Sequence, residues 1–159
     1  MKTKAFQMTK TRKKASTRGV PPTLAEDACP RCGTTMVERR AQLRLPVNGE
    51  DVAVPSALHM HCPKCDEIVL RSPDARRLQQ DAISVYRKSH GLLSAAEIKA
   101  IRERINLTQA EFARLLHLGS NTISRWESGR NVQTAAMEML LRLIRDVPGS
   151  VDYLRRHAA

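Results

Sequence analysis

The residues with the clearest chemical potential are four cysteines arranged as two Cys-x-x-Cys pairs. Cys29 pairs with Cys32, and Cys62 pairs with Cys65. Each pair places two thiols on a tight turn, and two such turns facing each other form the tetrahedral four-sulfur site that holds structural zinc. Because four thiolates leave no open position for water, we predict one structural Zn²⁺ rather than a catalytic metal.

Other uses of these cysteines stay open. A redox-active pair is expected beside a strand–helix–strand unit, and no such pattern surrounds either pair. Two disulfides would need an oxidising compartment, whereas the basic start of the chain is not followed by the apolar segment of a signal peptide. His59 and His61 are alternative ligands, although four thiols already complete a tetrahedral shell.

A polar helix face within residues 107–131 is a second candidate site. Asn121 and Arg125 fall on the side of a short predicted helix opposite Ile123 and Trp126, which can face a core. In the major groove of DNA an Asn side chain suits adenine and an Arg side chain suits guanine. We therefore expect Asn121 and Arg125 to read base edges, with a solvated polar face as the alternative.

The charge balance points to an anionic partner. The 159 residues include 27 Lys and Arg against 16 Asp and Glu, a formal net charge of +11, and nucleic acid is the first candidate. A membrane surface is the alternative, but no apolar run approaches the roughly 20 residues of a spanning helix.

Nearly half of the excess charge lies in residues 1–28, which hold seven basic and two acidic side chains. The segment lacks helical or strand periodicity, so we expect a disordered tail. The tail is either an arm that adds affinity for DNA phosphates or a solvated segment without a specific role. Met8 is an alternative start of the chain.

A β-hairpin is expected to bring the two cysteine pairs together. Residues 37–47 and 52–58 have strand-like composition, and Asn48-Gly49 between them is a strong signal for a two-residue turn. The prolines within the strands should confine them to sheet edges or interrupt them. We therefore predict a small zinc-binding module over residues 29–71 that needs its metal to fold.

A connecting helix is predicted over residues 72–93. Ser72 is expected to cap its start, with Pro73 at the first helical position, and the helix should end near His90, before Gly91. Its apolar residues recur at helical spacing, so the helix should pack on the zinc-binding module or bridge to the following domain.

An all-α domain of five helices is predicted over residues 94–159, which gives the chain the α+β class. Capping boxes are expected where Ser94 precedes Glu97 and where Thr108 precedes Glu111. These boxes place the starts of the first two helices.

The centre of this domain reads as helix, tight turn and helix. Residues 117–119 form the predicted turn, and Ser120 stands where the following helix needs an N-cap. Further on, Met139, Leu143 and Val147 widen the apolar stripe of another helix, which suggests a second partner beyond the core of the domain.

Residues 107–130 resemble the Cro/lambda-repressor-like (XRE) helix-turn-helix family. One departure is His117, where that family usually has glycine, although histidine tolerates the left-handed conformation better than most residues. The residues that carry the resemblance are Thr108, Gln109, Ala113, Ile123, Ser124, Arg125, Trp126, Glu127 and Gly129.

The order of the parts resembles a more specific family. A Cys-x-x-Cys, hairpin, Cys-x-x-Cys module, then a helix, then this helix-turn-helix domain is similar to the MqsA antitoxin family of bacterial toxin–antitoxin systems. The resemblance covers about residues 29–157 and leaves the basic tail outside.

That resemblance implies an antitoxin with two binding functions. In the family the zinc is structural, the N-terminal module binds a ribonuclease toxin, and the C-terminal module forms a homodimer that binds a palindromic operator in the promoter of its own operon. The hairpin strands are our candidate surface for the toxin.

The resemblance also assigns roles to individual residues. Asn121 and Arg125 would read bases, as the side-chain chemistry already indicated. Gln109 would buttress the second helix or contact a phosphate. The candidates for phosphate contacts are Ser120, Thr122 and Ser124.

Other functions remain as alternatives. The chain could be a stand-alone XRE-family transcriptional regulator with a structural zinc module. An enzyme is disfavoured because no nucleophile–base pair or open metal site is evident, and RNA binding is disfavoured because aromatic residues are only 3% of the chain. We expect a cytoplasmic bacterial protein that is nucleoid-associated when bound to its operator and has no membrane partner.

Overall fold

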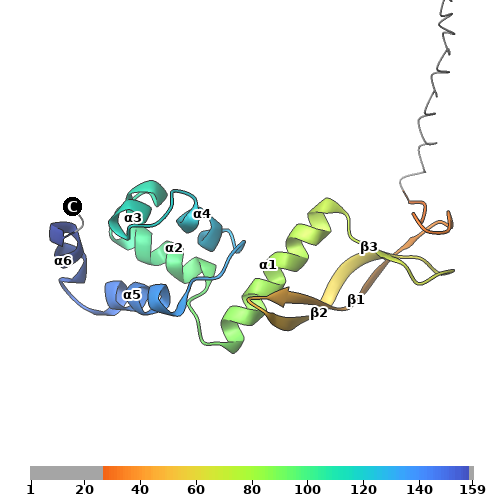
Figure 1. Ribbon diagram of the computed structural model, residues 1–159, viewed down its shortest axis with the longest axis horizontal. Coiled ribbons are helices and arrows are strands. Elements are labelled where there is room, and N and C mark those ends of the chain that lie inside the picture. The colour runs from red at the N-terminus through yellow and green to blue at the C-terminus, as the bar shows by residue number, and fades with distance from the viewer. Residues whose placement is uncertain (1–26, 158–159) are drawn as a thin grey trace, which may run out of the picture.

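A computed structural model describes residues 27–157 of the chain. The predictions for residues 1–26, including the tail and the alternative start at Met8, lie outside the described residues. The described part begins with a small antiparallel sheet and continues with helices (Figure 1), which confirms the α+β class. It contains six helices, one more than the five predicted for the last domain, because the connecting segment adds α1.

The sheet has the order β1-β2-β3, with β1 (Val37–Val47), β2 (Glu50–His61) and β3 (Ile68–Val69). Asn48 and Gly49 join the first two strands and adopt φ angles of 49° and 85°, which are the values that a two-residue hairpin turn requires. The predicted hairpin is therefore confirmed.

The prolines occupy the positions that a sheet tolerates. Pro46 lies in β1, an edge strand of the sheet. Pro55 falls at a register shift, because Ala41 pairs with Ala57 while Leu43 pairs with Val54. Such a bulge releases a residue from the hydrogen-bond ladder, which suits a residue without an N–H.

Two features of the sheet differ from the sequence prediction. β2 begins at Glu50 and ends at His61, so it extends past both ends of predicted residues 52–58. β3 was not predicted: Ile68 and Val69 pair with the end of β2. A two-residue strand is too short for any alternation of polar and apolar residues, so only the chain reversal at the second cysteine pair places it.

Helix α1 (Ser72–Ser89) covers one face of the hairpin. Its start corrects a prediction: Arg71 is the N-cap, and Ser72 is already helical and makes no cap hydrogen bond. The extended backbone of Arg71, with φ −66° and ψ 150°, is the conformation usual for an N-cap residue, and Pro73 lies in the first turn of the helix. The shared core consists of Val47, Val52, Val54, Ala57, Leu78, Ala82, Ile83, Tyr86 and Val132.

Five helices follow: α2 (Ala95–Arg104), α3 (Gln109–Leu115), α4 (Thr122–Glu127), α5 (Ala135–Asp146) and α6 (Ser150–His157). Both predicted capping boxes form, at Ser94 with Glu97 and at Thr108 with Glu111. The core of these helices consists of Leu93, Ile98, Ile101, Phe112, Ala113, Leu115, Leu116, Ile123, Trp126, Leu141 and Ile144.

The prediction of Ser120 as the N-cap of α4 is wrong. Asn121 is the N-cap, its backbone is already in the right-handed helical region, and it makes no side-chain cap bond. The reason is the preceding tight turn, in which Thr122 N donates to Gly119 O at 2.9 Å. That bond closes a turn over residues 119–122, so Ser120 lies inside the turn and α4 begins at Thr122, one residue later than a cap at Ser120 would place it.

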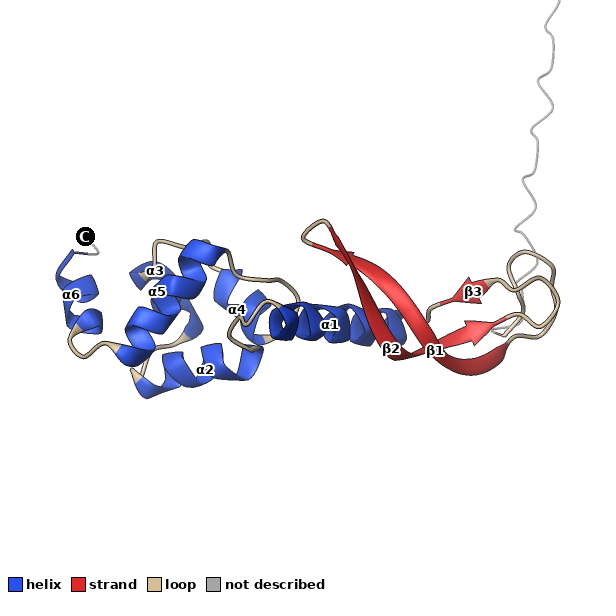
Figure 2. Ribbon diagram, turned by 90° about the horizontal axis from the view of Figure 1, so that it is seen from below, coloured by secondary structure: helices blue, strands red, loops and turns tan. Residues whose placement is uncertain are grey.

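Helix α1 runs alongside the hairpin, and its C-terminal end lies toward the remaining helices (Figures 1 and 2). Polar side chains of α5 and of the loop before it bind the backbone of the segment that follows α1. Leu93 N donates to the Glu138 carboxylate at 3.1 and 3.2 Å, and Gln133 donates to Leu93 O at 2.8 Å. Arg142 donates to Gly91 O at 2.6 Å. The connection between the two parts is thus anchored by side chains rather than left to solvent.

Candidate metal centre and nucleic-acid interface

The four predicted cysteines converge at the end of the sheet farthest from the α2–α6 helices. Their sulfur atoms all lie within 4.8 Å of one another. Cys29 Sγ is 3.6 Å from Cys65 Sγ, and Cys32 Sγ is 3.5 Å from Cys62 Sγ. Sulfurs at 2.3 Å from a tetrahedral zinc ion would be about 3.8 Å apart, so the arrangement fits a four-thiolate metal site.

The two cysteine pairs share one backbone design. Gly33 N donates to Cys29 O at 2.9 Å, and Asp66 N donates to Cys62 O at 3.1 Å. Gly33 and Asp66 both adopt positive φ angles, of 73° and 57°. Each turn therefore aims two thiols at the same side, and the ends of the hairpin bring the two turns face to face.

The described part begins before the first cysteine. Met36 N donates to Asp27 O at 2.8 Å, and Ala28 forms an isolated bridge with Thr35. Arg71 also bonds the Asp27 carboxylate at 2.8 Å. Asp27 and Ala28, which the sequence assigned to the tail, are thus part of the first cysteine turn.

The geometry of the cysteine cluster does not match disulfide bonds, and it does not include the two histidines considered as alternative ligands. Sulfurs 3.5 Å apart are not bonded as a disulfide, whose S–S length is about 2.05 Å, and all four cysteines are free. His59 is buried, and its Nδ1 lies 3.0 Å from Ala57 O. His61 Nε2 lies 3.2 Å from Asp66 Oδ1. Neither histidine belongs to the group of converging ligand atoms.

The electrostatics of the thiols differ across the cluster. A hydrogen bond with Thr34 lowers the pKa of Cys32 to about 6. The backbone of Glu67 acts on Cys65 in the same direction, but burial and the neighbouring thiols outweigh it and raise the pKa of Cys65 to about 12.

Helices α3 and α4 pack against each other and are joined by a tight turn. His117 adopts a φ of 52°, and the turn closes where Leu118 N donates to Ala113 O at 2.8 Å. Histidine therefore takes a left-handed conformation of the kind that glycine adopts most easily at the end of a helix. Ala113 is buried where α3 and α4 pack together, and the Ile123 and Trp126 side chains of α4 are buried below it.

The predicted nucleic-acid residues gather on the opposite side. Asn121 and Arg125 are exposed at the start and near the end of α4. Ser120 is exposed in the turn, and Thr122 and Ser124 are half-buried. The exposed pair lies one helical turn apart, as a helix face that enters a major groove requires.

Gln109 is tied into a network that the sequence did not reveal. Its amide donates to Glu127 Oε2 at 2.8 Å. Arg102 of α2 donates to both Glu127 oxygens, at 2.6 and 3.0 Å, and to Leu107 O at 2.9 Å. Burial raises the pKa of Glu127, but the bonds from Arg102 and Gln109 outweigh it and hold this pKa below its ordinary value. Gln109 thus buttresses α4, and residues 102 and 127 are too far apart in sequence for spacing to link them.

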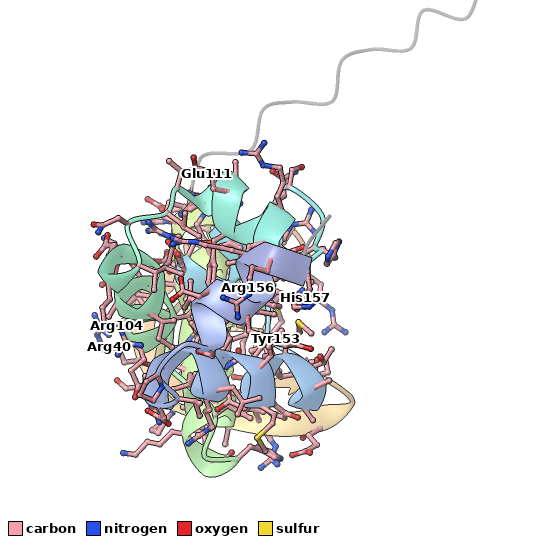
Figure 3. The ribbon with its side chains drawn as sticks, turned by 90° about the vertical axis from the view of Figure 1, so that its left-hand side faces the viewer. Arg40, Arg104, Glu111, Tyr153, Arg156 and His157 are labelled. Atoms are coloured by element: carbon pink, nitrogen blue, oxygen red, sulfur yellow. The ribbon has the colours of Figure 1, made fainter. Side chains whose placement is uncertain are left out.

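An apolar surface remains on the α5–α6 side. Met139 and Tyr153 are 60% and 59% exposed, and Leu143 and Val147 are also exposed. Figure 3 looks at the α6 end, where the labelled Tyr153, Arg156 and His157 lie at the surface. Tyr153 and His157 stack with ring centroids 4.3 Å apart. Side chains of this size are seldom left grouped in water without a partner.

Comparison with known proteins decides the family. Residues 26–155 match the family described as the antitoxin component of bacterial toxin-antitoxin systems, MqsA. The chain belongs to this antitoxin family. It is also 39% identical over 62 residues to antitoxin HigA-2 of Vibrio cholerae serotype O1 (strain ATCC 39315 / El Tor Inaba N16961). That match covers 39% of this chain and 60% of the relative's length.

The MqsA family assignment covers the cysteine cluster and the helix-turn-helix together, as the order of the parts indicated. None of the helices in residues 27–157 combines the length and hydropathy needed to cross a bilayer. The residues that sequence reasoning missed are long-range partners: the Arg102–Glu127 pair, and Gln133 and Glu138, which bond the backbone of Leu93.

Proposed function

We propose that the protein is the antitoxin of a type II toxin–antitoxin system that neutralises a ribonuclease toxin and represses its own operon. The observation that carries the proposal is the exposed pair Asn121 and Arg125 on α4 of a helix-turn-helix, in a chain of the MqsA antitoxin family. Membership of an antitoxin family supports a regulator rather than an enzyme.

We assign the binding functions to different parts of the chain. Residues 29–71 form the zinc-binding module that binds the toxin, residues 72–93 connect it, and residues 94–159 form the XRE-type domain that binds DNA and dimerises. The metal is one structural Zn²⁺, because four converging thiolates suit zinc and leave no position for water. Zinc bound there would tie the two cysteine turns together.

DNA recognition rests on side-chain chemistry at α4. Asn121 would pair with adenine and Arg125 with guanine, while Ser120, Thr122 and Ser124 would contact phosphates. A homodimer would present two α4 helices to half-sites about 34 Å apart on a palindromic operator. The exposed apolar residues of α5 and α6 supply a self-complementary surface for that dimer.

Substitution of Arg125 tests the DNA assignment. Arg125→Ala should cost roughly 1–3 kcal/mol of specific binding to the DNA that precedes the operon, and preference at one base pair should relax. Arg156→Ala, at the exposed α6 end, is the matched control and should keep that preference. Equal affinity of wild type and Arg125→Ala in a fluorescence titration would contradict the role of Arg125 in reading a base.

Toxin neutralisation needs a separate test, because the alternative is a stand-alone XRE-family regulator. Co-expression with the ribonuclease encoded beside the gene should restore growth that this ribonuclease inhibits. Operator binding without any restored growth would favour the stand-alone regulator. Fractionation should place the antitoxin in the cytoplasm, with the nucleoid when it is bound to its operator.

Light scattering tests the dimer. The wild-type chain should have the mass of two copies, and Leu143→Asp should shift it to one copy because a charge at an apolar interface must be desolvated. A single-copy mass for the wild type at micromolar concentration would contradict the dimer proposal.

A further inference from the structure

Helix α1 contacts the C-terminal end of α4 through a buried arginine. Arg87 is only 3% exposed. Its Nη2 atom donates to Trp126 O at 3.2 Å and to Asn131 O at 2.9 Å. Trp126 lies in the last turn of α4, and Asn131 lies in the loop that follows. One guanidinium therefore joins the end of α4 to the next loop.

Two further contacts reach the same loop from the same side. Gln80, seven residues before Arg87 on α1, donates to Ser128 O at 2.9 Å. Val132 is buried in the core that α1 forms with the hairpin. The loop after α4 is thus fixed at several points by the part of the chain that carries the cysteines.

Helix α4 depends on such contacts. It has six residues, and its N-cap makes no side-chain hydrogen bond. A helix this short is not stable by itself, so its direction is set by what holds its ends. A cation at the carbonyl end is also favourable for the helix dipole.

The burial of Arg87 carries a cost that packing alone does not explain. A buried guanidinium loses its hydration, and an apolar side chain of similar length would fill the space without that loss. Burial lowers the pKa of Arg87, and the negative charge of Glu138 opposes the shift. Among the described residues Arg87 Nε has no hydrogen-bond partner, so the contacts of this group are concentrated in Nη2.

We propose that Arg87 is a positioning residue for DNA recognition, which orients α4 from the connecting helix without touching DNA. Base reading needs side chains held within about 0.5 Å of their working geometry. The connecting helix then belongs to the DNA-reading unit as well as to the zinc-binding module. This inference rests on the proposed operator binding by Asn121 and Arg125.

The test compares specific and non-specific binding of full-length, zinc-loaded variants. Arg87→Met should weaken binding to the DNA that precedes the operon by about tenfold, and binding to a scrambled duplex should change by less than about twofold, because phosphate contacts tolerate small rotations. Arg87→Lys keeps a donor and a charge, so it should recover part of the specific affinity. Arg77→Met, an exposed arginine of the same helix, is the matched control.

The outcomes separate this inference from the proposed function. If the wild type does not prefer the native duplex over the scrambled one, operator binding itself fails. If the wild type discriminates and Arg87→Met discriminates equally well, or if both duplexes lose affinity in parallel, the positioning role is overturned. Gln80→Leu, at a partly exposed position, covers the case in which Arg87→Met does not fold. It should lower specific affinity in the same direction by about twofold to threefold, and an unchanged specificity ratio would overturn the role.

Discussion

The helical end and the cysteine end of the molecule are stabilised by different interactions. The helical end buries eleven residues in one apolar core. The cysteine end has a cluster of four buried residues, Cys29, Met36, Met60 and Cys62. Burial of apolar area stabilises the first, whereas the second is too small for that, so we expect it to depend on a metal bound by its thiols. The comparison predicts that each end fails under a different perturbation.

Metal removal should have the largest effect and should act on the cysteine end. Structural zinc sites contribute apparent binding free energies of about 10–16 kcal/mol. Chelation, or Cys62→Ser, should collapse the NMR dispersion of β3 and of the end of β2 that pairs with it, while the α2–α6 signals persist. Met60→Leu, which keeps the volume of the small cluster, is the control. Persistence of the β3 signals without metal would show that the ends do not differ in this way.

Truncation of the apolar core should have the next largest effect, at the helical end. Phe112 is fully buried, so Phe112→Ala should lower the free energy of unfolding by about 3–5 kcal/mol. Urea titration followed by helical circular dichroism measures this, with zinc content unchanged. Arg114→Ala, exposed on the same helix, should stay close to the wild type. A variant that released its zinc together with its helices would show instead that the two ends unfold as one.

Removal of one partner of the Arg102–Glu127 pair should have an intermediate effect. Glu127→Gln leaves the Arg102 guanidinium buried without its carboxylate, and should cost about 3 kcal/mol. Glu103→Gln is the matched control, because Glu103 contacts the same arginine at 3.6 Å from an exposed position and exposed pairs contribute less than about 1 kcal/mol. Equal losses in the two variants, in the same urea titration, would contradict a special role for the buried pair.

Acid should have the smallest effect, again at the helical end. Hydrogen bonds from Ser94 and Thr108 hold the pKa of Glu97 and Glu111 below the ordinary value. A carboxyl with a lowered folded pKa stabilises the fold above its unfolded pKa of about 4.3, and this contribution is lost as the pH falls through the folded value. The free energy of unfolding should therefore decline below about pH 4. Thr108→Val should decline less steeply than the wild type, and equal slopes for the two proteins would contradict the contribution of Glu111.

Local signals in the sequence predicted much of the fold and of the candidate site. The hairpin turn at Asn48-Gly49, the two capping boxes and the convergence of the cysteine pairs each follow from residues close in the chain or from a fixed spacing. The third strand, β3, was missed because two residues carry no pattern. The bonds of Glu127 and Glu138 were missed because their partners lie 25 and 45 residues away. The prediction of a cap at Ser120 was wrong because the hydrogen bond of the preceding turn makes α4 begin one residue later.

The burial of Val132 under the hairpin decides where the chain can be truncated to give a DNA-binding fragment. A cut before Ser94 would look natural from the sequence, since a capping box begins there. Such a fragment would leave behind α1, strip the side chain of Val132 of its apolar surroundings and remove the donors to Trp126 O and Ser128 O. A cut before α1, at residue 71, keeps those donors but removes the hairpin side chains that pack on Val132 and on the apolar face of α1. The shortest faithful DNA-binding fragment should therefore keep both the hairpin and the connecting helix.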